Sequence, residues 1–580
     1  MRLSQHFTFL KHYVFSNLRK QSFYVSLGFV AILFFIFYTN TLHEEYPDEF
    51  DNILGGFYIL KGIFPFSGFF SHHGPVAYFV AAIIALFSNG SFVTFRIVYS
   101  IALALFFLWS YWYLRVRVSA TQSRFYLISV LIFGLSATYF WLHMLLADSL
   151  ASVLIMPVVA ILLLRSMQGK QFIRSDLVII SALTFLMIFT SLTHVYVGIV
   201  VYVYTLYYYF FHKRRGMLGK ESLFLIAIFA VPYLLFGIYL ILTGSFDEYF
   251  YQSILYNQKY YIYNYPKPEG STFINPLRFA VVIFNGFFTN FTNLLVQVKD
   301  FNLGFPLNIT LALSNTVLLI YLACKRKYAL LLFWLGGIVF GNARSNPLES
   351  KETDYQSAVY VTISYIGLSF ILQSLYTELQ EALSFSKKVI FTSLFLLLGV
   401  YVFFFSIFIS KRFFYRYYEK YMGIAPKIYD QPELAKIMNT VVSNNEYTWI
   451  GPYEYEEMLY INGKIATKYH VFLPGMGNSP QIREDFIHEL QMNKPKALWF
   501  NKTFSILGTS PNQYGQFLTK FIDAEYLPLS EYLDTNLHYF ILTPRIHNVS
   551  VADSLYIRKD AIDEIVLKLI DGGILQEKLF

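Results

Sequence analysis

Long apolar runs separated by short basic clusters most limit how this chain can fold. The longest run, residues 177–211, ends at the basic cluster 212–215 and exceeds the length of one membrane helix, which needs about 20 apolar residues. Hydrophobic side chains make up 56% of the chain and charged ones 14%, against roughly a quarter charged in soluble domains. The sequence therefore predicts an integral membrane protein.

The composition also excludes other classes of protein. The apolar content is too high for disorder or collagen, heptads are absent, and Cys324 is the one cysteine, so no internal disulfide can form. The formal net charge of +8 comes largely from basic clusters beside apolar runs. We therefore interpret it as a topology signal and expect no nucleic-acid partner.

The basic residues orient the predicted spans. Arg19 and Lys20 precede the first run, residues 22–38, which lacks a cleavage site and predicts a cytoplasmic N-terminus. Residues 76–87 are too few to cross a bilayer and predict an interfacial helix. Counting them as a span would put Arg115 and Arg117 outside, against the positive-inside rule.

About eleven spans follow, with the run 177–211 turning at residues 191–194. Residues 330–340 are short for a span, and residues 279–298 are ambiguous. The predicted spans cover residues 22–38, 92–114, 125–142, 150–164, 177–211 as two helices, 222–242, 306–323, 330–340, 358–375 and 389–409.

The hydropathy falls after residue 410. Pro432 opens a predicted helix, residues 447–450 and 497–500 are predicted strands, and Pro480 opens a helix to Met492. We predict an all-α polytopic membrane domain in residues 1–410, with a long first external loop at 39–91. A soluble α/β extracytoplasmic domain in residues 411–580 would follow it.

The first external loop gathers acids and histidines. They are His43, Glu44, Glu45, Asp48, Glu49, Asp51, His72 and His73. A solvated acidic loop would explain them, but structureless loops of this length are uncommon unless functional. Carboxylates at a membrane surface can serve as general bases, and acids with histidines can hold a divalent cation.

Asp148 lies just beyond the outer end of a predicted span. A carboxylate at a membrane edge is a functional candidate by default, and a helix N-cap is the structural alternative. His194, at the predicted outer turn, is either a proton relay or a structural histidine.

These residues together resemble the GT-C superfamily of membrane glycosyltransferases. The closest likeness is to the group of protein O-mannosyltransferases and the lipid A aminoarabinose transferase, and it covers roughly the first 200 residues. It rests on Pro47-Asp48-Glu49, Gly62 to Phe66, Phe69-Phe70, Gly74-Pro75, Arg96, the basic turn at 115–124 and Ala147-Asp148.

The resemblance implies an inverting transfer of a sugar from a polyprenyl-phosphate carrier, similar to dolichyl-phosphate mannose, to a protein, lipid or glycan acceptor. It implies that Asp48, Glu49 and Asp148 are catalytic. A divalent metal, Mg²⁺ or Mn²⁺, would be held by Asp48, Asp148 and His73. The aminoarabinose branch has Glu-Lys-Pro where this chain has His73-Gly74-Pro75, so Lys61 is the candidate replacement cation.

Further substrate-binding candidates lie in later loops. By position, the aromatic loop 245–276, with Lys259 and Tyr260, resembles the external loop that helps to hold the carrier lipid. Arg344 is another external cation, and we expect either Lys259 or Arg344 to meet the donor phosphate. Most of the tyrosines here fit an interfacial aromatic belt equally well.

Two other functions compete with glycosyl transfer. A lipid-linked sugar transporter or flippase would scatter polar residues along its spans. A membrane-anchored binding scaffold would not depend on the loop acids. The expected location is a bacterial cytoplasmic membrane, with a role in cell-envelope glycosylation.

Overall fold

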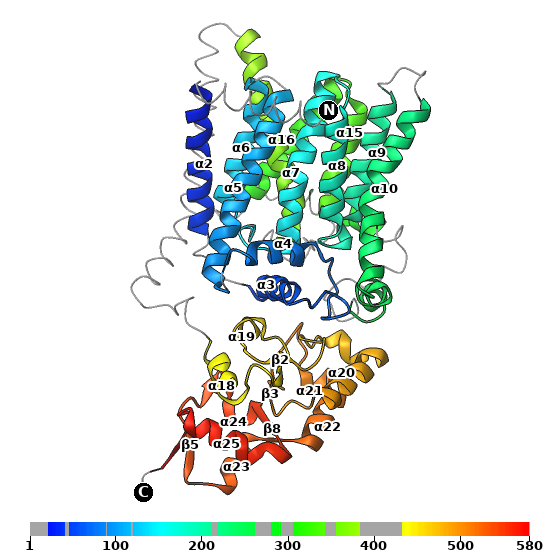
Figure 1. Ribbon diagram of the computed structural model, residues 1–580. Helices are drawn as coiled ribbons and strands as arrows, with labels where there is room; N and C mark the ends of the chain where they lie inside the picture. The colour runs from blue at the N-terminus through cyan, green and yellow to red at the C-terminus, as the bar shows by residue number, and fades with distance from the viewer. Residues whose placement is uncertain are drawn as a thin grey trace, which may run out of the picture.

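A computed structural model of the chain describes residues 21–40, 46–88, 90–117, 120–138, 140–211, 218–261, 280–288, 291, 306–342, 355–382 and 432–578. A bundle of near-parallel helices forms one part, and a smaller region of strands and helices forms the other (Figure 1). Helices α3 (Pro47–Leu60) and α4 (Val76–Ala85) lie across the end of the bundle, between the two parts. The predicted span 389–409 lies outside the described residues.

Five helices in the described part of the chain are long and apolar enough to cross a membrane: Phe92–Arg117, Ala147–Gln168, Leu192–Phe211, Leu223–Leu242 and Tyr355–Ser374. Shorter apolar helices include Ser123–Ser136, Thr310–Cys324 and Tyr328–Gly341. The last has 14 residues, about 21 Å at 1.5 Å per residue, less than the bilayer's hydrocarbon core. The predicted total of about eleven spans is therefore met only in part.

The bundle is built from ten helices among the described residues. They are α2 (Gln21–Asn40), α5 (Phe92–Arg117), α6 (Ala120–Ser136), α7 (Ala147–Gln168), α8 (Arg174–Ile188), α9 (Val195–Phe211), α10 (Leu218–Leu242), α14 (Pro306–Cys324), α15 (Tyr328–Gly341) and α16 (Ala358–Ala382). The predicted break in the run 177–211 is confirmed, because a short helix, η1 (Leu192–His194), separates α8 from α9.

Helix α7 is the core of the bundle, because its side chains are apolar on every face. Its membrane-length window is completely buried, and α7 packs against α8 and α16. In α10, which is equally apolar, only 11% of the window is buried. An apolar helix exposed in this way is expected to face lipid.

Two glycines let α3 and α4 cross closely. A Cβ added to Gly55 would lie 2.3 Å from Tyr78 Cδ1, and one added to Gly56 would lie 2.7 Å from the backbone of Ala81. Helix α4 has 10 residues, about 15 Å, which is half of a hydrocarbon core. This length agrees with the prediction that residues 76–87 do not span.

The basic loops lie at one end of the bundle. There Arg117 donates to Ser175 Oγ at 3.0 Å, and Arg165 Nε donates to Asp176 Oδ2 at 3.0 Å. Asp148 begins α7 and Arg165 is near its last turn, about 25 Å further along the helix axis. The predicted acidic site and these basic residues therefore occupy opposite ends of the bundle.

A five-stranded sheet organises the C-terminal region. Its order is β2-β1-β3-β8-β4, with β1 parallel to β2 and β3, and β8 antiparallel to β3 and β4. The strands are β1 (Tyr447–Gly451), β2 (Lys464–Ile465), β3 (Ala497–Phe500), β4 (Tyr526–Pro528) and β8 (Leu555–Arg558). The strands predicted at 447–450 and 497–500 are confirmed.

Helices cover this sheet, and two small hairpins complete the region. The helices are α18 (Glu433–Val441), α19 (Tyr455–Leu459), α20 (Pro480–Asn493), α21 (Pro511–Tyr514), α22 (Gln516–Glu525), α23 (Leu529–Thr535), α24 (Val551–Ser554) and α25 (Ile562–Asp571). The hairpins pair β5 (Tyr539–Ile541) with β9 (Leu575–Glu577) and β6 (Arg545–Ile546) with β7 (Val549–Ser550). The helices that begin near Pro432 and Pro480 match the predictions.

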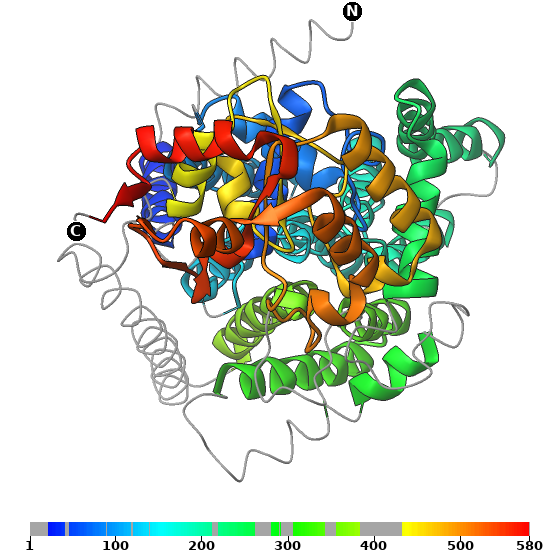
Figure 2. The same ribbon diagram turned by 90° about the horizontal axis from the view of Figure 1, so that it is seen from below.

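The C-terminal region is joined to the end of the bundle, which it covers in the view from below (Figure 2). The backbone N–H of Phe70 donates to Lys468 O at 2.8 Å, and Lys468 Nζ lies 2.9 Å from Glu248 Oε1. Helix α19 packs on α3. The first loop is therefore enclosed between the bundle and the C-terminal region.

Candidate active site

One cavity of about 330 Å³ lies where α3, the start of α7 and the C-terminal region meet. Its lining includes Asp48, Asp51, Asp148, His72 and His73. The structure therefore brings together acids from the first loop and from a span about a hundred positions further along the chain.

Asp48 occupies the first turn of α3. Pro47 opens this helix, because its fixed φ and missing N–H suit the first helical position, and a carboxylate there interacts favourably with the helix dipole. The Tyr453 hydroxyl donates to Asp48 Oδ1 at 2.5 Å. Burial and the negative charge of Asp48 raise the pKa of Tyr453 well above its ordinary value, so Tyr453 remains protonated and donates.

Asp148 faces the cavity from the first turn of α7. His194 Nε2, in η1, lies 3.1 Å from Asp148 Oδ1, and both side chains are almost fully buried. Asn52 Nδ2 on α3 donates to Leu145 O at 2.9 Å, which ties α3 to the segment preceding Asp148. Leu146 occupies the N-cap position of α7, so the N-cap alternative for Asp148 is wrong.

The two histidines of the first loop sit beside these acids. The rings of His72 and His73 have centroids 3.9 Å apart, and His72 lies 4.7 Å from the ring of Tyr261. A Cβ added to Gly74 would lie 2.0 Å from Phe189 O. Gly74 thus lets the loop approach the turn between α8 and α9, where His194 lies.

Glu49 has a different environment from its neighbour Asp48. It is fully buried, and Arg96 on α5 donates to both of its carboxylate oxygens, at 2.5 and 3.2 Å. Arg96 also lies over the ring of Phe92. Glu49 does not line the cavity, so the geometry favours anchoring α3 to the bundle over the predicted catalytic role.

The predicted phosphate-binding cations are not brought to the acids. Lys61 lies at the opposite end of α3 from Asp48, about 20 Å away along the helix, and lines another cavity. Lys259 is exposed on the segment η4 (Asn257–Tyr261), and neither Lys259 nor Tyr260 lines the acidic cavity, whereas Tyr261 does. Arg344 lies outside the described residues.

A second acid at the cavity, Asp51, was not singled out by the sequence. Its Oδ1 lies 2.9 Å from His470 Nε2, and Tyr78 donates to its Oδ2 at 2.9 Å. Burial and the charge of Asp51 raise the pKa of Tyr78, which keeps this hydroxyl a donor. The spacing of Asp48, Asn52 and Asp51 on a helix was a usable signal, but nothing in the sequence indicated His470.

The C-terminal sheet presents its strand ends to the cavity. Tyr453 and Tyr455 follow β1, and residues 504–507 follow β3, and both segments line the cavity. The chain passes from β1 to β2 on one side and later to β3 on the other. Ligands of open α/β sheets bind at such a reversal, outside the carboxyl ends of the strands.

The predicted metal ligands Asp48, Asp148 and His73 line one cavity. Within the described residues, however, only Glu454, Glu457 and His547 form a set of three with all ligand atoms within 4.8 Å of one another. Carboxylate and imidazole atoms at the first cavity are thus near one another without forming such a set. Metal dependence of that site remains a prediction.

Comparison of the chain with known protein families and with curated proteins finds no match.

Proposed function

We propose that this protein is a glycosyltransferase that moves a sugar from a polyprenyl-phosphate carrier to an acceptor hydroxyl at the outer face of a membrane. The observation that carries the proposal is the shared cavity of Asp48 and Asp148 at the end of a membrane-type helix bundle. A carrier whose chain lies in the bilayer would present its phosphate and sugar at this depth.

Asp48 is the proposed general base. Its carboxylate takes the proton from the acceptor hydroxyl, and that oxygen forms a bond to the anomeric carbon from the face opposite the phosphate. The bond between that carbon and the phosphate oxygen breaks, and polyprenyl phosphate leaves with the electron pair. One displacement of this kind inverts the configuration at the anomeric carbon.

The other residues of the cavity position the reactants. Asp148, held beside His194, is placed to accept hydrogen bonds from sugar or acceptor hydroxyls. His72 and His73 are the imidazoles on the cavity wall, and their N–H groups would donate to the phosphate as negative charge develops there. Tyr453 holds Asp48 in one orientation.

The central helix favours transfer over transport. Between Asp148 and Arg165, α7 carries no ionisable side chain and is buried throughout. A flippase would be expected to place polar groups midway along such a helix. The polar groups at the cavity gather instead at one end of the bundle.

Purified full-length protein in detergent, given labelled polyprenyl-phosphate sugars and a membrane extract as acceptor, tests the proposal. We expect labelled sugar in the acceptor fraction and release of polyprenyl phosphate in equal amounts. Movement of the donor across liposomes in the absence of acceptor, with no sugar transferred, would identify a flippase. Neither transfer nor translocation would favour a scaffold.

A further inference from the structure

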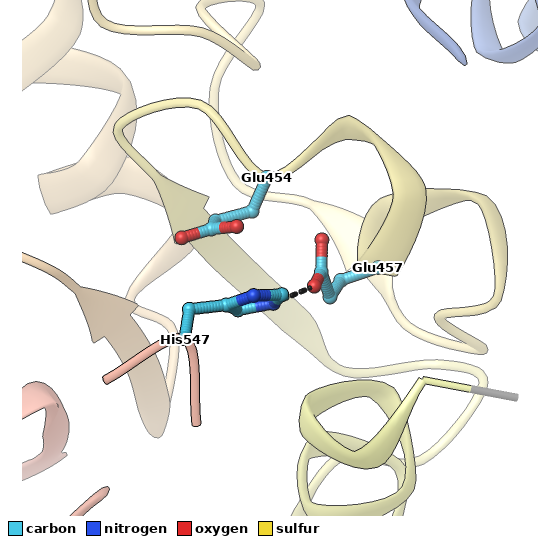
Figure 3. Close-up of side chains that lie close together, drawn as sticks. All are labelled: Glu454, Glu457 and His547. Atoms are coloured by element: carbon cyan, nitrogen blue, oxygen red, sulfur yellow. Dashed lines mark hydrogen bonds and ion pairs between the residues drawn. The ribbon is translucent and has the colours of Figure 1, made fainter. Parts of the chain in front are cut away.

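Three potential metal ligands converge in the C-terminal region, outside the Asp48 cavity. Glu454 precedes α19, Glu457 is on α19, and His547 is in the turn between β6 and β7. One ligand atom from each residue lies within 4.8 Å of those of the other two. In Figure 3 the two carboxylates lie on either side of the imidazole, and His547 Nε2 is 2.6 Å from Glu457 Oε1.

The two carboxylates are buried, with 7% of Glu454 and 2% of Glu457 exposed. They share one imidazole, so the cluster keeps a negative charge even when His547 is protonated. Within the described residues Glu454 forms no ion pair, although it points at the other two side chains. A buried carboxylate without a cation is costly, and a divalent ion would balance both negative charges.

A buried donor beside the cluster is also consistent with an ion. Trp499 is fully buried, and its indole N–H has no hydrogen-bond partner of normal geometry among the described residues. This N–H acts on Glu454 electrostatically. Carboxylates that bind metals usually accept such an outer hydrogen bond, and Trp499 is placed to supply it once an ion fixes Glu454.

The cluster is open on one side. The His547 side chain is 49% exposed, which leaves a route for an ion and room for a water ligand. His547 and Asn548 both have positive φ, 49° and 64°, so they form a two-residue turn of the I′ type. This turn presents the imidazole to the two carboxylates.

We propose that Glu454, Glu457 and His547 bind one divalent transition-metal ion, with water completing its coordination. Two carboxylates and one imidazole suit Zn²⁺ or Mn²⁺. The ion would join the β6–β7 turn to α19, which packs on α3. It would also fix Glu454 between Tyr453 and Tyr455, the two tyrosines that line the Asp48 cavity.

The test measures metal binding, so it does not depend on the proposed glycosyl transfer. Full-length protein without a polyhistidine tag is treated with a chelator in detergent, incubated with ZnCl₂ or MnCl₂, and exchanged into metal-free buffer. We expect one Zn²⁺ or Mn²⁺ per chain by elemental analysis. The melting temperature should rise by about 2–4 °C in saturating metal, because the ion binds only the folded state.

Glu454→Gln keeps the size of the side chain and removes one anionic ligand, so affinity should fall at least about 10-fold. His547→Gln should have the same effect, and its exposed position keeps the test valid if Glu454→Gln fails to fold. Glu456→Gln and His538→Gln are the matched controls and should bind metal as the unaltered protein does. Failure of that protein to retain either ion, or equal binding by Glu454→Gln and His547→Gln, would overturn the proposal.

Discussion

The Tyr453 hydroxyl donates a 2.5 Å hydrogen bond to Asp48 Oδ1, joining residues 405 positions apart in the chain. The bond connects the loop after β1 to the first turn of α3. Through it, the C-terminal region contributes directly to the cavity that holds the proposed general base. The region therefore belongs to the candidate active site and is more than an appended domain.

Tyr453→Phe removes this donor and leaves the ring in place. A hydrogen bond to a charged group contributes about 1.5–3 kcal/mol, so sugar transfer should fall roughly 10-fold or more while the protein still folds. Initial rates at saturating donor measure the effect. Tyr447→Phe, on β1 and away from the cavity, serves as the control, and an unchanged rate in Tyr453→Phe would show that Asp48 does not need this contact.

Glu49→Gln should act on stability. It leaves the buried Arg96 without its carboxylate, and breaking a buried ion pair costs about 3–5 kcal/mol. The melting temperature in detergent should fall, and Arg96→Met in the same chain should restore part of the loss. An unchanged melting temperature together with lost transfer would instead return Glu49 to the catalytic role that the resemblance implies.

The native Cys324 offers a test of orientation. It is exposed at the end of α14, next to the basic residues 325–327, which we expect to be cytoplasmic. A membrane-impermeant maleimide should label Cys324 only after lysis. With Cys324→Ser in the background, Met492→Cys, at a site 70% exposed in the C-terminal region, should be labelled in intact cells. The reverse pattern would place the acidic cavity on the cytoplasmic side.

The stability of the C-terminal region should depend on pH through Glu446. Burial alone would raise its pKa, but hydrogen bonds from Lys496 and Ser443 outweigh burial and lower the pKa to about 2. The contribution to folding is therefore complete above pH 4.5 and is lost as the pH falls toward 2. Glu446→Gln should remove roughly 1 kcal/mol at pH 7 and flatten the acid limb of the melting curve. An identical acid limb in Glu446→Gln would contradict this assignment.

Local patterns in the sequence predicted local structure well. The break at η1, the strands β1 and β3, and the short helix α4 all follow from periodicity, turn residues and length. The sequence could not separate Asp48 from Glu49. Neighbours on a helix point about 100° apart, so one faces the cavity and the other faces Arg96, although both belong to one acidic motif.

The partners of the site residues depend on the tertiary fold. His470 meets Asp51, and Tyr453 meets Asp48, only because the C-terminal region packs on α3. Nothing in the local sequence around either residue specifies that contact. Lys61 illustrates the opposite error, since closeness in sequence to the acids suggested a shared site, while the length of α3 places this lysine at the far end of the helix.

The most direct test of the account is sugar transfer by Asp48→Asn, measured with donor-lipid binding in the same detergent preparation. Asparagine keeps the size of the side chain and an acceptor for Tyr453, but it cannot take the proton from the acceptor hydroxyl. Transfer should fall roughly 10²- to 10⁴-fold, with donor binding and melting temperature unchanged, and Asp148→Asn should lose less. Full transfer activity in Asp48→Asn would contradict the proposed mechanism.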